Sequence, residues 1–149
     1  MADPAELVRR AIQAYNAKDI AASLALYASD AEASMPGREL KGQDGVREFY
    51  KREFEAFPDG RMTLLIEAVS GSTVFSECSW SGTNTGPYHL PTGETLPPTG
   101  KKATIKFATV GTIDNNKIAS LRAYWDNMDL LRQLGLVPAG AGATAGGHA

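Results

Sequence analysis

The carboxylate that closes the last extended segment of the chain is the first candidate for chemistry. That segment ends in Tyr124-Trp125-Asp126, and with a period of two Arg122, Tyr124 and Asp126 share one face of a strand. Desolvation at the mouth of an apolar pocket would raise the pKa of such a carboxyl group, which suits a general acid or base. We therefore take Asp126 as the candidate catalytic residue. It is equally well placed to cap a following helix, since one carboxyl oxygen can cap while the other faces a pocket.

Several other side chains could hold a ligand near this carboxylate. An earlier strand places Cys78 and Trp80 on one face, and Asn84 continues the same parity. Trp80 and Asn84 could form a pocket wall with a polar handle, although core packing is the plainer interpretation of Trp80. Cys78 is expected to be a small buried hydrophobe and not a nucleophile. The candidate substrate-binding residues are Tyr15, Trp80, Asn84, His89, Phe107, Arg122, Tyr124 and Trp125.

Histidine and cysteine are scarce, and this excludes several kinds of site. The 149 residues include one cysteine, Cys78, and two histidines, His89 and His148. Zinc and non-haem iron sites usually need two or three His or Cys ligands, so we expect no metal site. His89 lies in a Pro-rich loop, where a solvated side chain is the plainer interpretation, and His148 lies in an Ala/Gly-rich tail. Proton chemistry is therefore expected to run through a carboxylate.

The charge balance and hydropathy exclude other partners. Lys and Arg number 15 against 17 Asp and Glu, a net charge of −2, and a nucleic-acid binder would usually show a basic excess. No run of ~18 apolar residues predicts a membrane span. The acidic N-terminus has no apolar stretch after it, so we expect no signal peptide and a cytoplasmic location.

The elements that must position these residues are helices first and strands afterwards. Asp3 caps and Pro4 opens an N-terminal helix that runs to about Tyr15, and Asp19 can cap a second helix. The hydrophobic periodicity then predicts a strand at 31–35, a polar loop, and a helix from 42 up to the turn at 57–60. Four longer strands are predicted at 61–69, 74–81, 103–113 and 117–125, with a loop at 83–102. A short helix is predicted around 130–134.

This order of elements predicts an α+β fold. A curved antiparallel sheet would wrap around the N-terminal helices and leave a concave pocket, which is the default ligand site. We expect one domain over residues 1–137. The Ala/Gly-rich segment 138–149 has too little apolar bulk to pack and is predicted to be disordered.

Short motifs along the chain resemble the SnoaL-like polyketide cyclases. Gly82-Thr83-Asn84-Thr85-Gly86-Pro87 resembles their Gly-Thr-His-Thr-Gly turn, and Pro97-Pro98-Thr99-Gly100-Lys101-Lys102 resembles their Pro-Thr-Gly-Lys entrance to the third long strand. Tyr124-Trp125-Asp126 and the following Leu130-Leu131-Arg132-Gln133-Leu134-Gly135-Leu136 resemble their aromatic-Asp end and Leu-Leu-x-Gln-Leu-Gly helix. The resemblance extends over residues 4–137.

The resemblance implies a cone-shaped, nuclear-transport-factor-2-like (cystatin-like) fold with an apolar pocket, without metal or cofactor. It also implies frequent dimers, so we expect a homodimer that binds an apolar small molecule. In these cyclases one aspartate drives an intramolecular aldol ring closure, and Asp126 stands at the matching position. Asn84 stands where they usually have histidine, and an amide cannot exchange protons near neutral pH.

Three functions stay open on this basis. The first is a cofactor-free cyclase or isomerase of an apolar carbonyl compound, with Asp126 as acid/base and Asn84 and Tyr15 as orienting groups. The second is hydrolysis, as in related epoxide hydrolases with an Asp-Arg-Asp arrangement, to which Arg122 and Asp126 would contribute. The third is a non-catalytic binding or dimerisation module, which is the preferred hypothesis if Asp126 turns outward and only caps a helix.

Overall fold

The computed structural model describes residues 3–136, which form four helices and eight strands. The helices are α1 (Pro4–Asn16), α2 (Ile20–Leu24), α3 (Gly42–Ala56) and α4 (Asn127–Gln133). The strands are β1 (Tyr27–Met35), β2 (Arg38–Lys41), β3 (Arg61–Ser70), β4 (Thr73–Thr83), β5 (Tyr88–His89), β6 (Thr95–Leu96), β7 (Lys102–Asp114) and β8 (Lys117–Tyr124). The tail predicted to be disordered, residues 138–149, lies outside the described residues.

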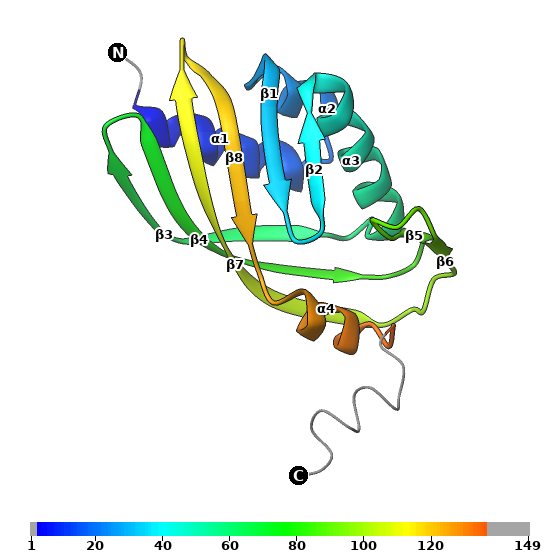
Figure 1. Ribbon diagram of the computed structural model, residues 1–149. Coiled ribbons are helices and arrows are strands. Elements are labelled where there is room, and N and C mark those ends of the chain that lie inside the picture. The colour runs from blue at the N-terminus through cyan, green and yellow to red at the C-terminus, as the bar shows by residue number, and fades with distance from the viewer. Residues whose placement is uncertain (1–2, 137–149) are drawn as a thin grey trace.

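Six of these strands form one curved sheet in the order β2-β1-β8-β7-β4-β3 (Figure 1). Neighbouring strands are antiparallel except β1 and β8, which are parallel and come from opposite ends of the chain. β5 and β6 form a separate two-stranded ribbon. The predicted α+β fold, a curved sheet around N-terminal helices, is confirmed, with one parallel pair in the otherwise antiparallel sheet.

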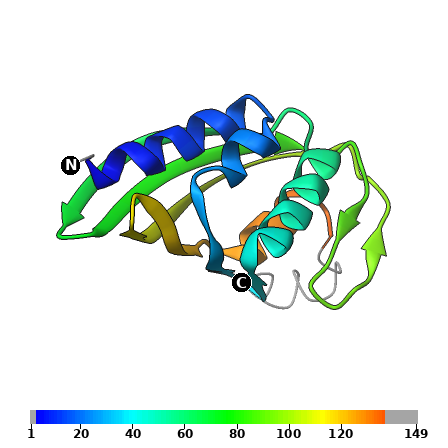
Figure 2. The ribbon, with the colours of Figure 1, turned by 90° about the horizontal axis from the view of Figure 1, so that it is seen from above.

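α1 and α2 begin where their capping residues predict. The Asp3 carboxylate accepts a hydrogen bond from the amide of Ala5 at 3.1 Å, and the Asp19 carboxylate accepts one from the amide of Ala22 at 3.0 Å. These bonds satisfy amide groups that a helix start leaves without partners. α1 then packs along β3, and α3 lies against β1 and β2 (Figure 2). No helix among residues 3–136 has the length and apolar character needed to cross a bilayer.

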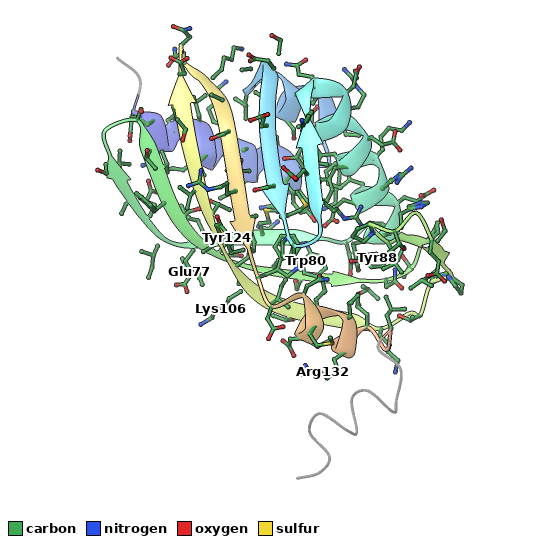
Figure 3. All side chains as sticks on the ribbon, viewed as in Figure 1. Glu77, Trp80, Tyr88, Lys106, Tyr124 and Arg132 are labelled. Carbon is green, nitrogen blue, oxygen red and sulfur yellow. The ribbon has the colours of Figure 1, made fainter. Side chains whose placement is uncertain are left out.

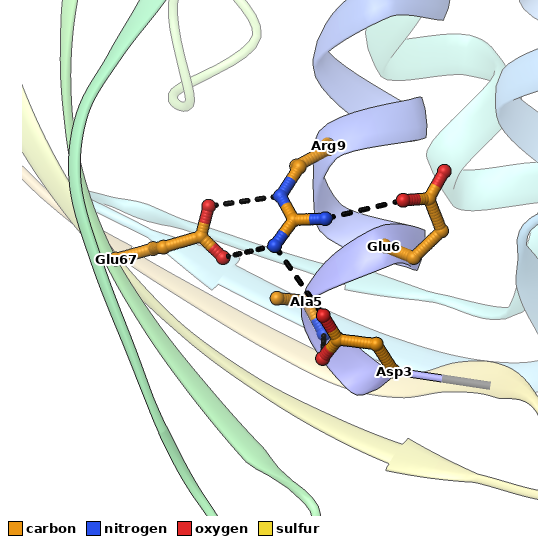
Figure 4. A network of polar contacts seen from close by, with 5 residues as sticks. All are labelled: Asp3, Ala5, Glu6, Arg9 and Glu67. Atoms are coloured by element: carbon orange, nitrogen blue, oxygen red, sulfur yellow. Dashed lines mark hydrogen bonds and ion pairs between the residues drawn. The ribbon is translucent and has the colours of Figure 1, made fainter. Parts of the chain in front are cut away.

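An ion-pair network joins the first turns of α1 to the sheet (Figure 4). The Arg9 guanidinium contacts both carboxylate oxygens of Glu67 on β3 at 2.9 Å. It also contacts Glu6 at 3.1 Å and Asp3 at 3.3 Å on its own helix. The Arg9 side chain is 41% exposed, so solvent screens this network. It therefore orients α1 along β3 more than it stabilises the fold.

Two segments predicted as loops contain strands. Residues 38–41 form β2, an edge strand that pairs Arg38 with Met35 after a turn in which Gly37 has φ +78°. Leu40 is the one apolar side chain among these four residues, and a single apolar residue does not reveal an edge strand by its periodicity. Tyr88 and His89 likewise pair with residues 95–96 inside the predicted loop 83–102. Strands of two residues are too short to produce any periodicity.

Candidate functional site

An apolar cavity of about 170 Å³ lies between the concave side of the sheet, α1 and α3. Its sheet wall consists of inward-facing side chains of β4, β7 and β8, including Trp80, Phe107 and Leu121. In Figure 3, Trp80 and Tyr88 lie within the fold, whereas Glu77 projects outward from β4. A cavity of about 150 Å³ holds benzene in an engineered protein, so this one is large enough for a small apolar ligand.

Among residues 3–136, one carboxylate lines this cavity, and it belongs to Glu53 of α3. The hydroxyl of Tyr15 donates a hydrogen bond to Glu53 Oε2 at 2.8 Å. Trp80 Nε1 in turn donates to the Tyr15 hydroxyl at 2.8 Å, which completes a chain from β4 through α1 to α3. Glu53 Oε1 has no hydrogen-bond partner among the residues that the structure describes. That oxygen is therefore available to a molecule in the cavity.

The surroundings of Glu53 favour its protonated form more than water does. Burial raises the pKa of the Glu53 carboxyl group, while the hydrogen bond from Tyr15 and the charges of Arg38 and Lys18 oppose the rise. Burial and the nearby Glu53 charge raise the pKa of Tyr15 far above its usual value. Tyr15 thus keeps its proton and donates a hydrogen bond to the carboxylate. A carboxyl group with a raised pKa in an apolar site is suited to accept and return protons near neutral pH.

Two more polar side chains lie at the same end of the cavity. Arg38 of β2 and Tyr88 of β5 both line it. Arg38 also donates a hydrogen bond to the backbone oxygen of His89, which ties the β5–β6 ribbon to β2. Burial and the charge of Glu53 raise the pKa of Tyr88, so its hydroxyl keeps its proton. A cation and a neutral hydroxyl therefore accompany the carboxylate.

The structure corrects the expected position of Asp126. This residue is exposed and does not line the cavity. Its Oδ1 accepts a hydrogen bond from the amide of Asp129 at 3.0 Å, so Asp126 is the N-cap of α4. The neighbouring Trp125, of opposite parity, faces the cavity instead. The helix-capping role foreseen for Asp126 is confirmed, and its expected place at the pocket mouth is wrong.

Arg122 and Tyr124 share the outward face with Asp126. Tyr124 is 54% exposed, and Arg122 Nε donates to its hydroxyl at 3.2 Å on the outer surface. Inward positions of β8 are held by Leu121 and Ala123. Arg122 and Tyr124, which were predicted to bind substrate, therefore lie outside the cavity lining, because the face of β8 that points inward is the opposite of the one assumed.

Asn84 and His89 also lie outside the cavity wall. The fully buried Asn84 side chain donates to the backbone oxygen of Gly86 at 2.9 Å and accepts from the amide of Thr99 at 2.9 Å. His89 contacts Thr95 at 3.0 Å and Glu55 at 3.4 Å within and beside the ribbon. Both residues hold loops together, so the ligand-binding role expected of them is not supported by their positions.

The remaining candidates do line the cavity. These are Tyr15, Trp80, Phe107 and Trp125. Cys78 lies beside them and is 1% exposed, and burial raises the pKa of its thiol, which agrees with a small buried hydrophobe.

Glu53, Arg38 and Tyr88 were not foreseen. A usable signal existed for Glu53, which falls within the apolar stripe of α3. Among residues 3–136, no cluster of His, Cys, Asp or Glu is arranged to hold a metal ion.

Comparison with known proteins agrees with this architecture. A family model described as SnoaL-like polyketide cyclase matches residues 5–134. A candidate SnoaL-like polyketide cyclase from Jannaschia sp. CCS1 superimposes with a TM-score of 0.79 at 17% identity, covering 91% of this chain and 93% of that one. TsrD from Streptomyces laurentii superimposes with a TM-score of 0.78 at 24% identity, covering 92% and 100%.

A protein with a ketosteroid isomerase-like fold from Catenulispora acidiphila, solved with trimethylamine, superimposes with a TM-score of 0.74 at 18% identity, covering 89% of this chain and 94% of that one. No curated protein matches the sequence. These identities support a shared fold, and the family match spans nearly all of the described residues. The chain therefore belongs to the SnoaL-like polyketide cyclase family.

Proposed function

We propose that this protein is a cofactor-independent acid/base enzyme that acts on a small apolar carbonyl compound, with Glu53 as the proton acceptor. The observation that carries the proposal is the Glu53 carboxylate inside an apolar cavity, with Oε2 held by Tyr15 and Oε1 free among the described residues. Glu53 thus takes the place that the sequence suggested for Asp126. Such a group combines a raised pKa with a fixed orientation, and general-base catalysis requires both.

The chemistry follows from these groups. Glu53 Oε1 removes a proton from the carbon next to a ligand carbonyl, and the C–H electron pair moves into the enolate. Arg38 and Tyr88 lie on the same cavity and stabilise the negative charge that develops on the enolate oxygen. The enolate carbon then attacks a second carbonyl of the same molecule, which closes a ring, or it is reprotonated at another carbon, which isomerises the substrate. Glu53 returns the proton in either case.

The alternative is a ligand-binding module without catalysis. The outward position of Asp126, which is engaged in capping α4, favours it over any mechanism that relies on Asp126. Epoxide hydrolysis through Arg122 and Asp126 has no such support, because both residues are on the outer surface. Catalysis and binding alone differ in whether a bound ketone exchanges its protons.

Deuterium exchange tests the proposal without knowledge of the natural substrate. The protein is incubated with 2-tetralone in D₂O, and loss of the α-proton signals is followed by NMR. We expect Glu53→Gln to slow exchange by about 100-fold or more, which is the contribution of a general base, while binding persists. Asp126→Asn is the matched control and should exchange at the wild-type rate.

Two results would contradict the assignment. If Asp126→Asn abolished exchange and Glu53→Gln did not, the base would be Asp126. If the wild-type protein bound the ketone without exchange above the buffer rate, the binding module would be the better description.

We further propose that the chain forms a homodimer through the outer face of the sheet and works in the cytoplasm. Ile66 is 62% exposed and Phe75 44% exposed on this face. Glu77 and Lys106 on the same face provide one negative and one positive charge (Figure 3). A twofold axis could pair such a face with itself. Phe75→Glu should convert a dimer into a monomer in sedimentation, whereas a monomeric wild-type protein at high concentration would refute the dimer.

The free thiol of Cys78 is compatible with a reducing compartment, which supports the proposed cytoplasmic location.

A further inference from the structure

A second polar group lies in the same cavity, on the sheet and away from Glu53. Ser76 of β4 and Thr109 of β7 are directly opposite each other in register, and both line the cavity. Ser76 is 6% exposed and Thr109 8% exposed. Their hydroxyl groups share a hydrogen bond of 2.5 Å. Polar side chains are uncommon in such an apolar wall, and the mechanism proposed above makes no use of them.

This pair retains an unused hydrogen-bond donor. Two hydroxyl groups contain two O–H bonds, and the bond between them uses one. Within residues 3–136, the hydroxyl groups of Ser76 and Thr109 have no second oxygen or nitrogen partner. The thiol of Cys78 is the other group in reach of Ser76, and sulfur is a weak acceptor. A buried donor of this kind is stabilised if a ligand in the cavity offers an oxygen.

The Ser76–Thr109 pair and Glu53 lie at different positions along the cavity. Three successive rungs of the sheet face the cavity, namely Trp80 with Ile105, Cys78 with Phe107, and Ser76 with Thr109. Four residues of strand separate Ser76 from Trp80, which is about 13 Å at most. Trp80 marks the Glu53 end, because its indole donates to Tyr15. A ligand that contacts both the Glu53 end and the Ser76–Thr109 pair must therefore extend along these three rungs.

We propose that the Ser76–Thr109 pair binds an oxygen at the far end of the ligand, and that the ligand is a rigid molecule of two fused six-membered rings. Its carbonyl lies at the Glu53 end and a hydroxyl or second carbonyl oxygen lies at the opposite end. Two fused rings are elongated enough to lie along the three rungs, and they suit the cavity volume of about 170 Å³. The inference rests on the proposed function for the carbonyl end alone.

Two probes that differ in one group test this subsite. They are 2-acetylnaphthalene and 6-acetyl-2-naphthol, which share the carbonyl and differ in the distal hydroxyl. By calorimetry the wild-type protein should bind the naphthol about threefold to tenfold more tightly, the effect of one net hydrogen bond. The double variant Ser76→Ala, Thr109→Val should bind both probes equally. Replacing both partners with apolar groups is close to neutral for folding, and the melting curve checks this.

Two controls separate hydrogen bonding from general damage. Thr109→Ser keeps a hydroxyl and should keep the preference for the naphthol. Ser79→Ala removes a hydroxyl from the outer face of the same strand and should also keep it. A double variant that preserves the preference, or a wild-type protein that shows none, would overturn the subsite. A folded wild-type protein that binds neither probe would overturn the two-ring ligand.

The two proposals fail separately. Glu53→Gln should keep the preference for the naphthol, since the distal pair is intact. If Glu53→Gln exchanged ketone protons normally while the preference still depended on Ser76 and Thr109, the proposed function would fail and the subsite would stand. If exchange depended on Glu53 while the double variant still preferred the naphthol, the subsite would fail alone.

Discussion

Replacing Tyr15 with phenylalanine removes one oxygen on which two other polar groups depend. The Tyr15 hydroxyl accepts a hydrogen bond from Trp80 Nε1 and donates one to Glu53 Oε2, both at 2.8 Å. Tyr15 is 1% exposed and Trp80 5% exposed, so water does not easily replace the lost group. The variant keeps the aromatic ring, and therefore its edge contact with Phe54 at a centroid distance of 5.2 Å. The experiment thus isolates the hydrogen bonds from the packing.

The expected loss of stability follows from the hydrogen-bonding groups of Trp80 and Glu53 that Tyr15→Phe leaves without a partner. A hydrogen bond to a charged group contributes about 1.5–3 kcal/mol, and a buried donor without a partner costs about 1–3 kcal/mol. Because the two effects overlap, we expect Tyr15→Phe to lower the free energy of unfolding by about 2–4 kcal/mol. For a domain of this size that corresponds to a fall in Tm of about 5–12 °C.

Chemical denaturation and a thermal melt measure this loss, with Tyr124→Phe as the matched control. Tyr124 is 54% exposed, and its hydroxyl contacts only Arg122 among the described residues, so its loss should cost under about 0.5 kcal/mol. Tyr15→Phe also removes a group that lowers the pKa of Glu53, so the acid limb of the deuterium-exchange rate should move to higher pH. If Tyr15→Phe were as mild as Tyr124→Phe and left the pH profile in place, the hydrogen-bonded chain would not exist as described.

Three further predictions concern Glu53, Gly86 and Arg9. Folding raises the pKa of Glu53, so the stability that this group contributes is present below its ordinary pKa of 4.5 and is lost as the pH rises through the folded pKa. Glu53→Gln should therefore gain stability relative to wild type between acid and neutral pH in paired denaturation curves. A Cβ at Gly86 would lie 1.9 Å from the backbone oxygen of Glu55, so Gly86→Ala should lower stability by about 1–3 kcal/mol or more, while a variant as stable as wild type would disprove the close approach. Arg9→Ala should lower Tm slightly at low salt, and the difference should vanish in 1 M NaCl because the Glu67 contact is screened; a large, salt-independent loss would contradict this.

Most of the secondary structure could be predicted from the sequence, because its signals are local. Asp3 and Asp19 cap helices at the predicted positions, and Asn115 and Asn116 adopt φ of +50° and +63° between β7 and β8, in the gap between two predicted strands. The four long strands predicted from alternation all form, although register shifts interrupt the alternation in β3 and β8. β2 and the β5–β6 ribbon pair with segments close in the sequence, but strands of two to four residues are too short to produce a periodic pattern.

The position of Asp126 could not be settled by parity alone. Alternation divides β8 into two faces, but it does not say which one points inward, and both faces carry aromatic residues. A register shift between Thr112 and Ile113 also changes the inward face near the start of β8, so that Ile118 and Leu121 are both inward despite their odd spacing. A one-residue shift reverses every later side chain, which is how an exposed cap resembled a pocket residue.

Glu53 is a cavity residue that the sequence pattern did not single out. It lies three and four residues from Tyr50 and Phe49 and four before Phe57, so it occupies the apolar stripe of α3. A carboxylate in such a stripe must find a partner, and here the partner is Tyr15 of α1. The break in the stripe was visible, but its partner was not, because helix-to-helix pairing is a tertiary property.

The asparagine at the turn has a different meaning from the one that its sequence position suggested. Asn84 uses its carbonyl oxygen to accept from Thr99 and its amide nitrogen to donate to the backbone oxygens of Ala56 and Gly86. Joining these two loops requires one donor and one acceptor at the end of a buried side chain, and an amide supplies both at every pH. A neutral histidine also supplies one of each, so the two residue types can be exchanged at a scaffold position without any proton transfer. Asn84 therefore acts as a scaffold residue of this turn, and the proposed mechanism assigns the proton transfer to Glu53 instead.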